Sequence, residues 1–268
     1  MRVAAYQAPL LPAGSTELAL SLIRERVEWC ESEGVEILCC PEGVLGGLAD
    51  YAPRPMAFAI DVEGGQLHTA LAPLASNRVT TIVGFTERAS RGRLFNAAAV
   101  FHRGSVIGVY RKLYPAINKS VYAAGDKMPV FTVGDLTFGI VICLDSTYYE
   151  PARIMAAQGA AALFVPTNNG MPPTRGGPEL PRKQGTRTSL GRWRTACRSC
   201  VRMWSGEPVI SCPTDHPGLS AEVGPYSERR RRSKPAWLLR TSRPHHASRG
   251  RDGTPRGILL WRVNTRNW

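Results

Sequence analysis

Short β-branched apolar runs, each bounded by Gly, Pro or charged residues, recur through residues 1–180. Runs of this kind predict β-strands. Between the first two runs, apolar residues recur at helical spacing from Ala19 to Cys30, which predicts an amphipathic helix over 15–32 with Ser15 as its cap. Strands that alternate with helices predict an α/β fold in which helices cover the faces of the sheets.

The same patterns predict the other elements. We expect strands over residues 2–7, 36–41, 80–86, 95–101, 106–110, 129–133, 136–142 and 162–166. Two more helices are expected over 65–77 and about 149–158. The loops 46–58, 113–128 and 167–180 are rich in Gly, Pro and polar residues, so we expect them to form the walls and the lid of a pocket.

A polar side chain follows three of the apolar runs. Cys143 follows the run over 138–142, Glu42 follows the run over 37–41, and Lys112 follows the run over 106–111. In open α/β folds, ligands bind just beyond the carboxyl ends of the strands. A carboxylate, an amine and a thiol in such places are the components of a cysteine acyl-transfer enzyme, so we expect the three side chains to converge.

Longer motifs surround these three residues. They are Pro41-Glu42-Gly43, Tyr110-Arg111-Lys112-Leu113, and the run over 143–153 with Cys143, Asp145, Tyr148, Glu150 and Arg153 at fixed offsets. In these motifs the chain resembles the nitrilase-like carbon–nitrogen hydrolases, over residues 1 to about 180. Lesser matches are Gln7, the run Gly84-Phe85-Thr86-Glu87, the run Phe95-Asn96-Ala97-Ala98, Gly159-Ala160 and the run Val165-Pro166-Thr167-Asn168.

Three features depart from the family pattern. Tyr149 stands where the family prefers Pro, and Leu144 stands where it prefers a polar or aromatic residue. Many members also carry a second Glu shortly after the Lys, but no acidic residue lies between Lys112 and Gly125. A helper carboxylate is therefore not expected in this loop.

The resemblance implies a four-layer α-β-β-α sandwich that is incomplete at its C-terminus. It also implies that Glu42 takes the proton of the Cys143 thiol and that Lys112 supplies a fixed positive charge. The backbone N–H of Leu144 would be a second donor to the oxyanion. The substrate would be a small amide or carbamoyl compound, with a nitrile as second choice, and no metal or organic cofactor is required. Family members are usually homo-oligomeric.

Other residues near the motifs are expected to be structural. We expect Asp145, Glu150 and Arg153 to form structural ion pairs rather than catalytic contacts. Cys39 and Cys40 adjoin Glu42 in sequence, and we interpret both as core residues.

The composition changes near residue 180. Residues 181–268 contain 19 Lys and Arg against 5 Asp and Glu, a balance of +14, within a chain whose formal net charge is +13. Five of the six Trp also lie there, and apolar periodicity is lost apart from short pieces such as Ile258-Leu259-Leu260-Trp261. This composition predicts a disordered basic tail that is separate from a hydrolase domain over 1–180.

The tail is also compatible with a shift of reading frame near Leu180–Pro181. Read one base out of phase, its permitted codons can spell segments similar to the family's Arg-Ala-x-Glu-Asn helix, its next strand and its Gly-Ser-Ser-Gly turn. Met203-Trp204 has a single spelling, ATG-TGG, and the shifted triplet GTG encodes the expected Val. We therefore hypothesise a frameshift, which arose naturally or in sequencing.

Two other functions are possible for the chain: a catalytically inactive frameshift product, or a nucleic-acid-binding protein with a basic tail. The four Arg at 229–232 favour the latter only weakly, because the tail has no regular interleaving of aromatic and basic residues. The tail also contains part of a zinc-site pattern, with ligands of the right type at Cys197, Cys200, Cys212 and His216. A second Cys-x-x-Cys or a paired His spacing, which a zinc site needs, is missing. We expect no metal site and no nucleic-acid partner.

No apolar run is long enough to span a membrane, and the N-terminus lacks the apolar core of a signal peptide. The seven Cys are irregularly spaced and do not form a recognisable disulfide framework. An enzyme that needs a free thiol is suited to a reducing compartment, so we expect a cytoplasmic protein.

Overall fold

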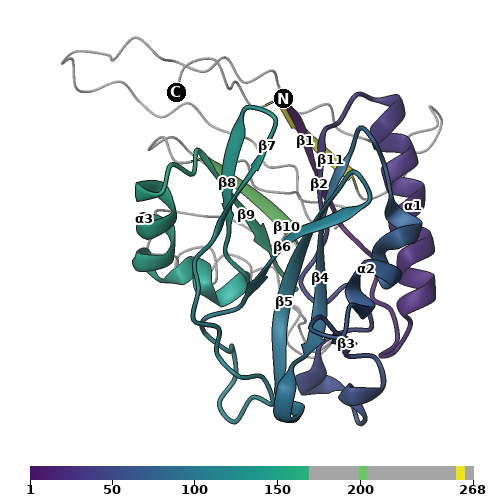
Figure 1. The fold of residues 1–268 in the computed structure, drawn as a ribbon, viewed down its shortest axis with the longest axis vertical. Coiled ribbons are helices and arrows are strands. Elements are labelled where there is room, and N and C mark those ends of the chain that lie inside the picture. The colour runs from purple at the N-terminus through teal and green to yellow at the C-terminus, as the bar shows by residue number, and fades with distance from the viewer. Residues whose placement is uncertain (169–198, 204–257, 263–268) are drawn as a thin grey trace, which may run out of the picture.

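The computed structural model describes residues 1–168 and two later strands, Ser199–Met203 and Ile258–Arg262. Within these ranges the strands form two sheets that lie between helices (Figure 1). The helices are α1 (Thr16–Ser32), α2 (Gln66–Leu71) and α3 (Tyr149–Ala157). Short 3-10 helices occur at Ala49–Tyr51, Pro55–Ala57, Ala72–Leu74, Ser90–Gly92 and Cys143–Thr147.

The larger sheet has the strand order β11-β1-β2-β4-β5-β6 among the described residues, and β3 pairs with β4. Strands β1, β2 and β4 run parallel, whereas β5, β6 and β11 pair antiparallel with their neighbours. The strands are β1 (Arg2–Tyr6), β2 (Ile37–Cys39), β3 (Ile60–Asp61), β4 (Thr80–Arg88), β5 (Leu94–His102), β6 (Ser105–Arg111) and β11 (Ile258–Arg262).

The smaller sheet has the order β10-β9-β8-β7 in the described part of the chain. Strands β8 and β9 are parallel, and the two outer strands pair antiparallel with them. The strands are β7 (Val130–Val133), β8 (Leu136–Ile140), β9 (Ala162–Pro166) and β10 (Ser199–Met203).

Side chains alternate between two cores along the strands of the larger sheet. In β2, Ile37 and Cys39 join one core together with Phe138 of the smaller sheet, whereas Leu38 joins a second core together with Ile23 of α1. This is the two-residue period of a strand that is buried on both faces. Helix α3 packs on the smaller sheet through its own apolar face. The predicted α-β-β-α layering is therefore confirmed.

The predicted helices and strands agree closely with the observed bounds. The largest difference is at the predicted helix 65–77, where α2 ends at Leu71 and a 3-10 helix follows over Ala72–Leu74. Pro73 lies in that segment, and proline lacks the backbone N–H that an α-helix needs there. Ser15 occupies the N-cap position of α1, but its side chain makes no capping hydrogen bond.

The predicted disordered tail over 181–268 differs from the structure at two segments, which form β10 and β11. The sheet edges at β9 and β1 explain where they lie, because edge strands present unpaired N–H and C=O groups to which a further strand can pair. The rest of the tail, including residues 229–232 and the zinc-like Cys and His set, lies outside the described side chains.

Gly84 in β4 allows the segment that carries Glu42 to pack against the sheet. A Cβ at this position would lie 2.6 Å from the backbone N of Gly43 and 2.9 Å from the Cα of Glu42. We expect Gly84→Ala to lower the free energy of unfolding by about 1–3 kcal/mol, because the obstructing atoms belong to the backbone. Urea unfolding measures this loss.

Gly108→Ala in β6 is the matched control. The three atoms nearest its added Cβ all belong to the ring of Phe131, so a side chain rather than the backbone obstructs it. We expect the loss of stability to be smaller than for Gly84→Ala. An equal loss in the two variants would contradict the close packing of the Glu42 segment against β4.

Candidate active site

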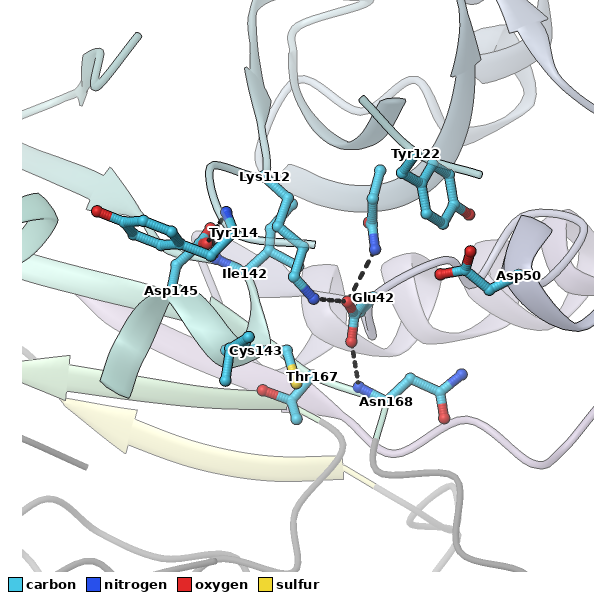
Figure 2. Close-up of polar contacts among 12 residues, drawn as sticks. Glu42, Asp50, Lys112, Tyr114, Tyr122, Ile142, Cys143, Asp145, Thr167 and Asn168 are labelled. Carbon is cyan, nitrogen blue, oxygen red and sulfur yellow. Dashed lines mark hydrogen bonds and ion pairs between the residues drawn. The ribbon is translucent and has the colours of Figure 1, made fainter. Parts of the chain in front are cut away.

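Glu42 follows β2 in a turn and is almost fully buried, with 2% of its surface exposed. Its Oε1 accepts hydrogen bonds from Asn96 Nδ2 at 2.8 Å and from Lys112 Nζ at 2.6 Å. Its Oε2 accepts the backbone N–H of Asn168 at 2.9 Å (Figure 2). The carboxylate is therefore held by three donors from three separate segments.

Lys112 follows the last residue of β6 and is 3% exposed. Its backbone N–H donates to the carbonyl of Asn96 at 2.8 Å, so the pairing between β5 and β6 continues to this residue. Burial by itself lowers the pKa of Lys112, but the negative charge of Glu42 and the hydrogen bond to it outweigh this effect, so the net pKa lies above its ordinary value. The ammonium group therefore remains charged at neutral pH.

Cys143 begins the 3-10 helix that follows β8 and has a φ of +46°. This left-handed conformation is strained for a residue other than glycine, and such strain is common at functional sites. Burial raises the pKa of the Cys143 thiol well above its ordinary value. The charge of Glu42 and a hydrogen bond to it raise the pKa further, whereas the charge of Lys112 lowers it. The resting residue is thus a thiol beside a carboxylate.

Asp145 lies two residues after Cys143 and is completely buried. Its carboxylate accepts four hydrogen bonds, from Tyr110 Oη at 2.7 Å and from the backbone N–H groups of Tyr114 at 2.9 Å, Ile142 at 3.2 Å and Leu113 at 3.3 Å. Burial raises the pKa of Asp145 to about 6, and these hydrogen bonds limit the rise.

Figure 2 shows the side chains of Glu42, Lys112 and Cys143 pointing toward one another. Two contacts agree with this arrangement. Lys112 and Glu42 form an ion pair at 2.6 Å, and Glu42 is hydrogen-bonded to Cys143, whose pKa it raises. The predicted convergence of these side chains is therefore observed. A thiol, a buried carboxylate and a buried ammonium group at one point can carry out nucleophilic acyl transfer.

Comparison with known proteins agrees with this chemistry. The model of the family described as carbon-nitrogen hydrolase matches residues 2–179. The chain belongs to this family. A protein described as "Hydrolase in pqqF 5'region" from Pseudomonas protegens is 32% identical over 178 residues, which make up 64% of this chain and 61% of that protein. An (R)-stereoselective amidase from Pseudomonas sp. is 28% identical over 162 residues, or 60% of this chain and 57% of that protein.

A solved structure of an amidase from Nesterenkonia sp. has the same fold. It matches with a TM-score of 0.56 at 22% sequence identity, and the match covers 68% of each chain. The match to the two Pseudomonas proteins spans about three fifths of their length.

The structure also places other residues that the sequence motifs single out in this family member. Cys39 and Cys40 are fully buried in the two cores, as predicted. The backbone N–H of Leu144 donates no hydrogen bond to any described residue, so it is available to a ligand. Glu150 and Arg153 are exposed on α3 and form no ion pair within the described residues, so the structural ion pairs expected for them stay a prediction.

Asn96 and the backbone of Asn168 are site residues to which the sequence analysis assigned no role. Both lie in runs that match the family, but Asn96 sits in the middle of an alanine-rich strand. Nothing in the local pattern indicates that its side chain contacts Glu42. The contact depends on the pairing of β5 with β4, which places Asn96 opposite Thr86 and close to the turn that carries Glu42.

Of the predicted pocket walls, only Gly46 and Gly47 of loop 46–58 and Asn168 of loop 167–180 line the described pocket beside Glu42, and no residue of loop 113–128 lines it. Loops 46–58 and 113–128 are joined because Asp50 accepts hydrogen bonds from Ser120 Oγ at 2.9 Å and from the N–H of Val121 at 2.8 Å. The pocket beside Glu42 also has a wall that was not predicted, formed by the apolar segment over residues 8–12. Residues 169–180 of the third loop lie outside the described residues.

Neither a metal site nor a membrane span emerges from the described residues. No three His, Cys, Asp or Glu side chains within residues 1–168 gather closely enough to hold a metal ion. None of the helices in this part of the chain is both long and apolar enough to cross a membrane.

The buried Asp145 carboxyl leads to a prediction about pH. Its pKa of about 6 in the folded protein exceeds the ordinary value of 3.8, so the folded state favours the protonated form. The resulting stabilisation is fully present below pH 3.8 and is lost as the pH rises through about 6. The difference between the two pKa values corresponds to about 3 kcal/mol of unfolding free energy.

Urea unfolding of wild type and Asp145→Asn across this pH range tests the prediction. We expect the difference in unfolding free energy between the two proteins to change by this amount, because the variant lacks the titrating group. Asp135→Asn, on the exposed turn between β7 and β8, is the control for the same substitution outside the site. A constant difference between wild type and Asp145→Asn would contradict the raised pKa.

Proposed function

We propose that this protein is a hydrolase that cleaves the non-peptide C–N bond of a small amide or carbamoyl compound, with a nitrile as the second choice of substrate. The observation that best supports this function is the buried ion pair between Lys112 Nζ and Glu42 Oε1 at 2.6 Å, together with the hydrogen bond between the Cys143 thiol and Glu42. Membership of the carbon–nitrogen hydrolase family supports the reaction class, as does the amidase named among the relatives.

In the proposed mechanism Glu42 is the base and later the acid. Its Oε1 is bound by Asn96 and Lys112, its Oε2 is bound by the backbone of Asn168, and the Cys143 thiol is hydrogen-bonded to the same carboxylate. As Cys143 Sγ attacks the carbonyl carbon, the thiol proton moves to Glu42.

The tetrahedral oxyanion then needs donors. The charged Lys112 ammonium and the N–H of Leu144, which has no partner among the described residues, supply them. Glu42 returns the proton to the leaving amine, the C–N bond breaks, and a thioester on Cys143 remains. Glu42 next takes a proton from water, whose oxygen attacks the thioester and releases a carboxylic acid and the thiol.

The test is a hydrolysis assay of the 268-residue chain on small amides, carbamoyl compounds and nitriles, with ammonia release as the readout. Mass spectrometry of the quenched reaction should show the substrate's acyl group on a peptide that contains Cys143. The proposal is contradicted if the folded protein turns over none of these compounds, or if the acyl group is found on another residue.

We also propose that residues 181–268 derive from a shifted reading frame. The change in charge and the shifted codons support it, and the family match ends at residue 179, close to the proposed break. Resequencing the DNA across codons 175–215 tests for a sequencing error. If the DNA is unchanged, a one-base correction should give a more active and more stable protein, and a less stable product would contradict the proposal.

Two properties of the working enzyme are proposed with it. A cytoplasmic location is supported by the need for a reduced Cys143 thiol, and fractionation of the source cells tests it. A homo-oligomeric state is supported by the resemblance to a family that usually forms oligomers. Light scattering of the purified protein measures its mass, and a monomer would contradict this expectation.

A further inference from the structure

Asp145 connects the two segments that carry Lys112 and Cys143. Tyr110, Leu113 and Tyr114, which donate to its carboxylate, lie on both sides of Lys112 in the chain. Ile142, the fourth donor, immediately precedes Cys143. The buried Asp145 carboxylate is therefore hydrogen-bonded to residues on both sides of Lys112 and to the residue before Cys143.

The two segments belong to different sheets. Lys112 follows β6 of the larger sheet, and Cys143 follows β8 of the smaller one. Their relative position is consequently not set by the hydrogen bonds within either sheet. In the described structure, the hydrogen bonds of Asp145 extend from the Cys143 turn in one sheet to the end of β6 in the other.

Asp145 also closes the turn in which Cys143 adopts its strained conformation. The N–H of Asp145 donates to the carbonyl of Ile142 at 3.0 Å, and the N–H of Ile142 donates back to Asp145 Oδ2 at 3.2 Å. These two bonds enclose Cys143 with its φ of +46°. A residue in this region of φ and ψ persists only where the surrounding contacts hold it.

The chemistry of the contacts specifies a carboxylate at this position. All four groups around Asp145 are donors, and an ionised carboxylate is a side chain that only accepts. Within the described residues, Lys112 directs its ammonium group to Glu42 rather than to Asp145. An amide in place of the carboxylate would direct an N–H toward at least one of these donors.

We propose that Asp145 is a positioning residue that holds Lys112 and Cys143 in the relative arrangement needed for acyl transfer. This inference rests on the proposed function, because it assigns Asp145 a part in the same reaction. Asp145 acts through the other two residues and contacts no substrate. Its removal therefore lowers the rate of chemistry more than it weakens substrate binding.

The first experiment compares Asp145→Asn with Asp135→Asn, the exposed control. We expect Asp145→Asn to lower kcat by about 10²-fold, the cost of a misplacement of about 1 Å, and to change KM by less than about threefold. If Asp145→Asn does not fold by circular dichroism, Tyr110→Phe removes a single donor and should lower kcat by about three- to tenfold. Unchanged kcat in the folded variant overturns the proposal.

The second experiment does not require amide hydrolysis. It measures the rate at which iodoacetamide alkylates Cys143, in a double-mutant cycle of Lys112→Ala and Asp145→Asn. In the presence of Asp145, loss of the Lys112 charge should slow alkylation about tenfold, because that charge lowers the pKa of the thiol. In the Asp145→Asn background the same change should have less than about a twofold effect, because Lys112 no longer sits beside Cys143.

The two experiments separate the two proposals. If wild type hydrolyses none of the tested compounds, the proposed function fails, yet the alkylation cycle still measures the coupling of Asp145 to Lys112 and Cys143. If the effect of Lys112→Ala on alkylation is the same with and without Asp145, the two substitutions are independent. Asp145 would then be structural only, and the positioning role is overturned.

Discussion

Replacing Cys143 by Ala should abolish amide hydrolysis. In the proposed mechanism the thiol forms the covalent bond to the acyl group, and its loss leaves Glu42 without the nucleophile that it activates. Removal of a catalytic nucleophile typically lowers kcat by about 10⁶-fold, which is below detection in an ammonia-release assay. Cys143→Ser should be similarly inactive, because the hydroxyl is a weaker nucleophile and this site is arranged for a thiol.

The stability of these variants should change little. Cys and Ala have the same left-handed strain at a φ of +46°, so the loss of activity cannot be assigned to unfolding. Cys30→Ala is the matched control, because Cys30 is a fully buried thiol that packs from α1 into the core. It should retain most of the activity. Turnover by folded Cys143→Ala would exclude the proposed mechanism.

Replacing Lys112 by Met should remove both activity and much of the stability. Met has nearly the same length but no charge, so the carboxylate of Glu42 would remain buried with only neutral donors. Breaking a buried ion pair from one side costs about 3–5 kcal/mol. Loss of one oxyanion donor alone lowers kcat by about 10²–10³-fold.

Two further variants separate these effects. Lys112→Met combined with Glu42→Gln removes both charges of this buried pair, so its unfolding free energy should recover relative to Lys112→Met while it stays inactive. Arg24→Met, which breaks an exposed pair with Glu28 on α1, should cost less than about 1 kcal/mol. Urea unfolding measures stability in all four proteins. If the double variant were no more stable than Lys112→Met, the buried pair could not account for the loss.

Much of the candidate site could be predicted because its residues end strands. Glu42, Lys112 and Cys143 each follow an apolar run, and the termination of such runs is visible in the linear pattern. The layering was predictable for a similar reason: Ile37, Leu38 and Cys39 are all apolar because their strand is buried on both faces. These properties depend on neighbours in the chain, so the sequence alone contains them.

The exposure of Glu150 and Arg153 shows where local pattern is insufficient. Their spacing of three is compatible with an ion pair that supports the Cys143 turn. Helix α3 instead directs Pro151, Ala152 and Met155 toward the smaller sheet, which leaves the two charged residues on the solvent side. Which face of a short helix is buried depends on the element against which it packs, and for α3 that element is a sheet.

The sequence by itself determined the family, the order of most strands and helices, and the three residues proposed for chemistry. Only the tertiary structure showed that Asn96 donates to Glu42 and that Asp145 joins the Lys112 and Cys143 segments. Both contacts link residues that are far apart in sequence, and the Asp145 contacts also link two sheets. Such contacts depend on strand order and sheet packing, which no local pattern of residues encodes.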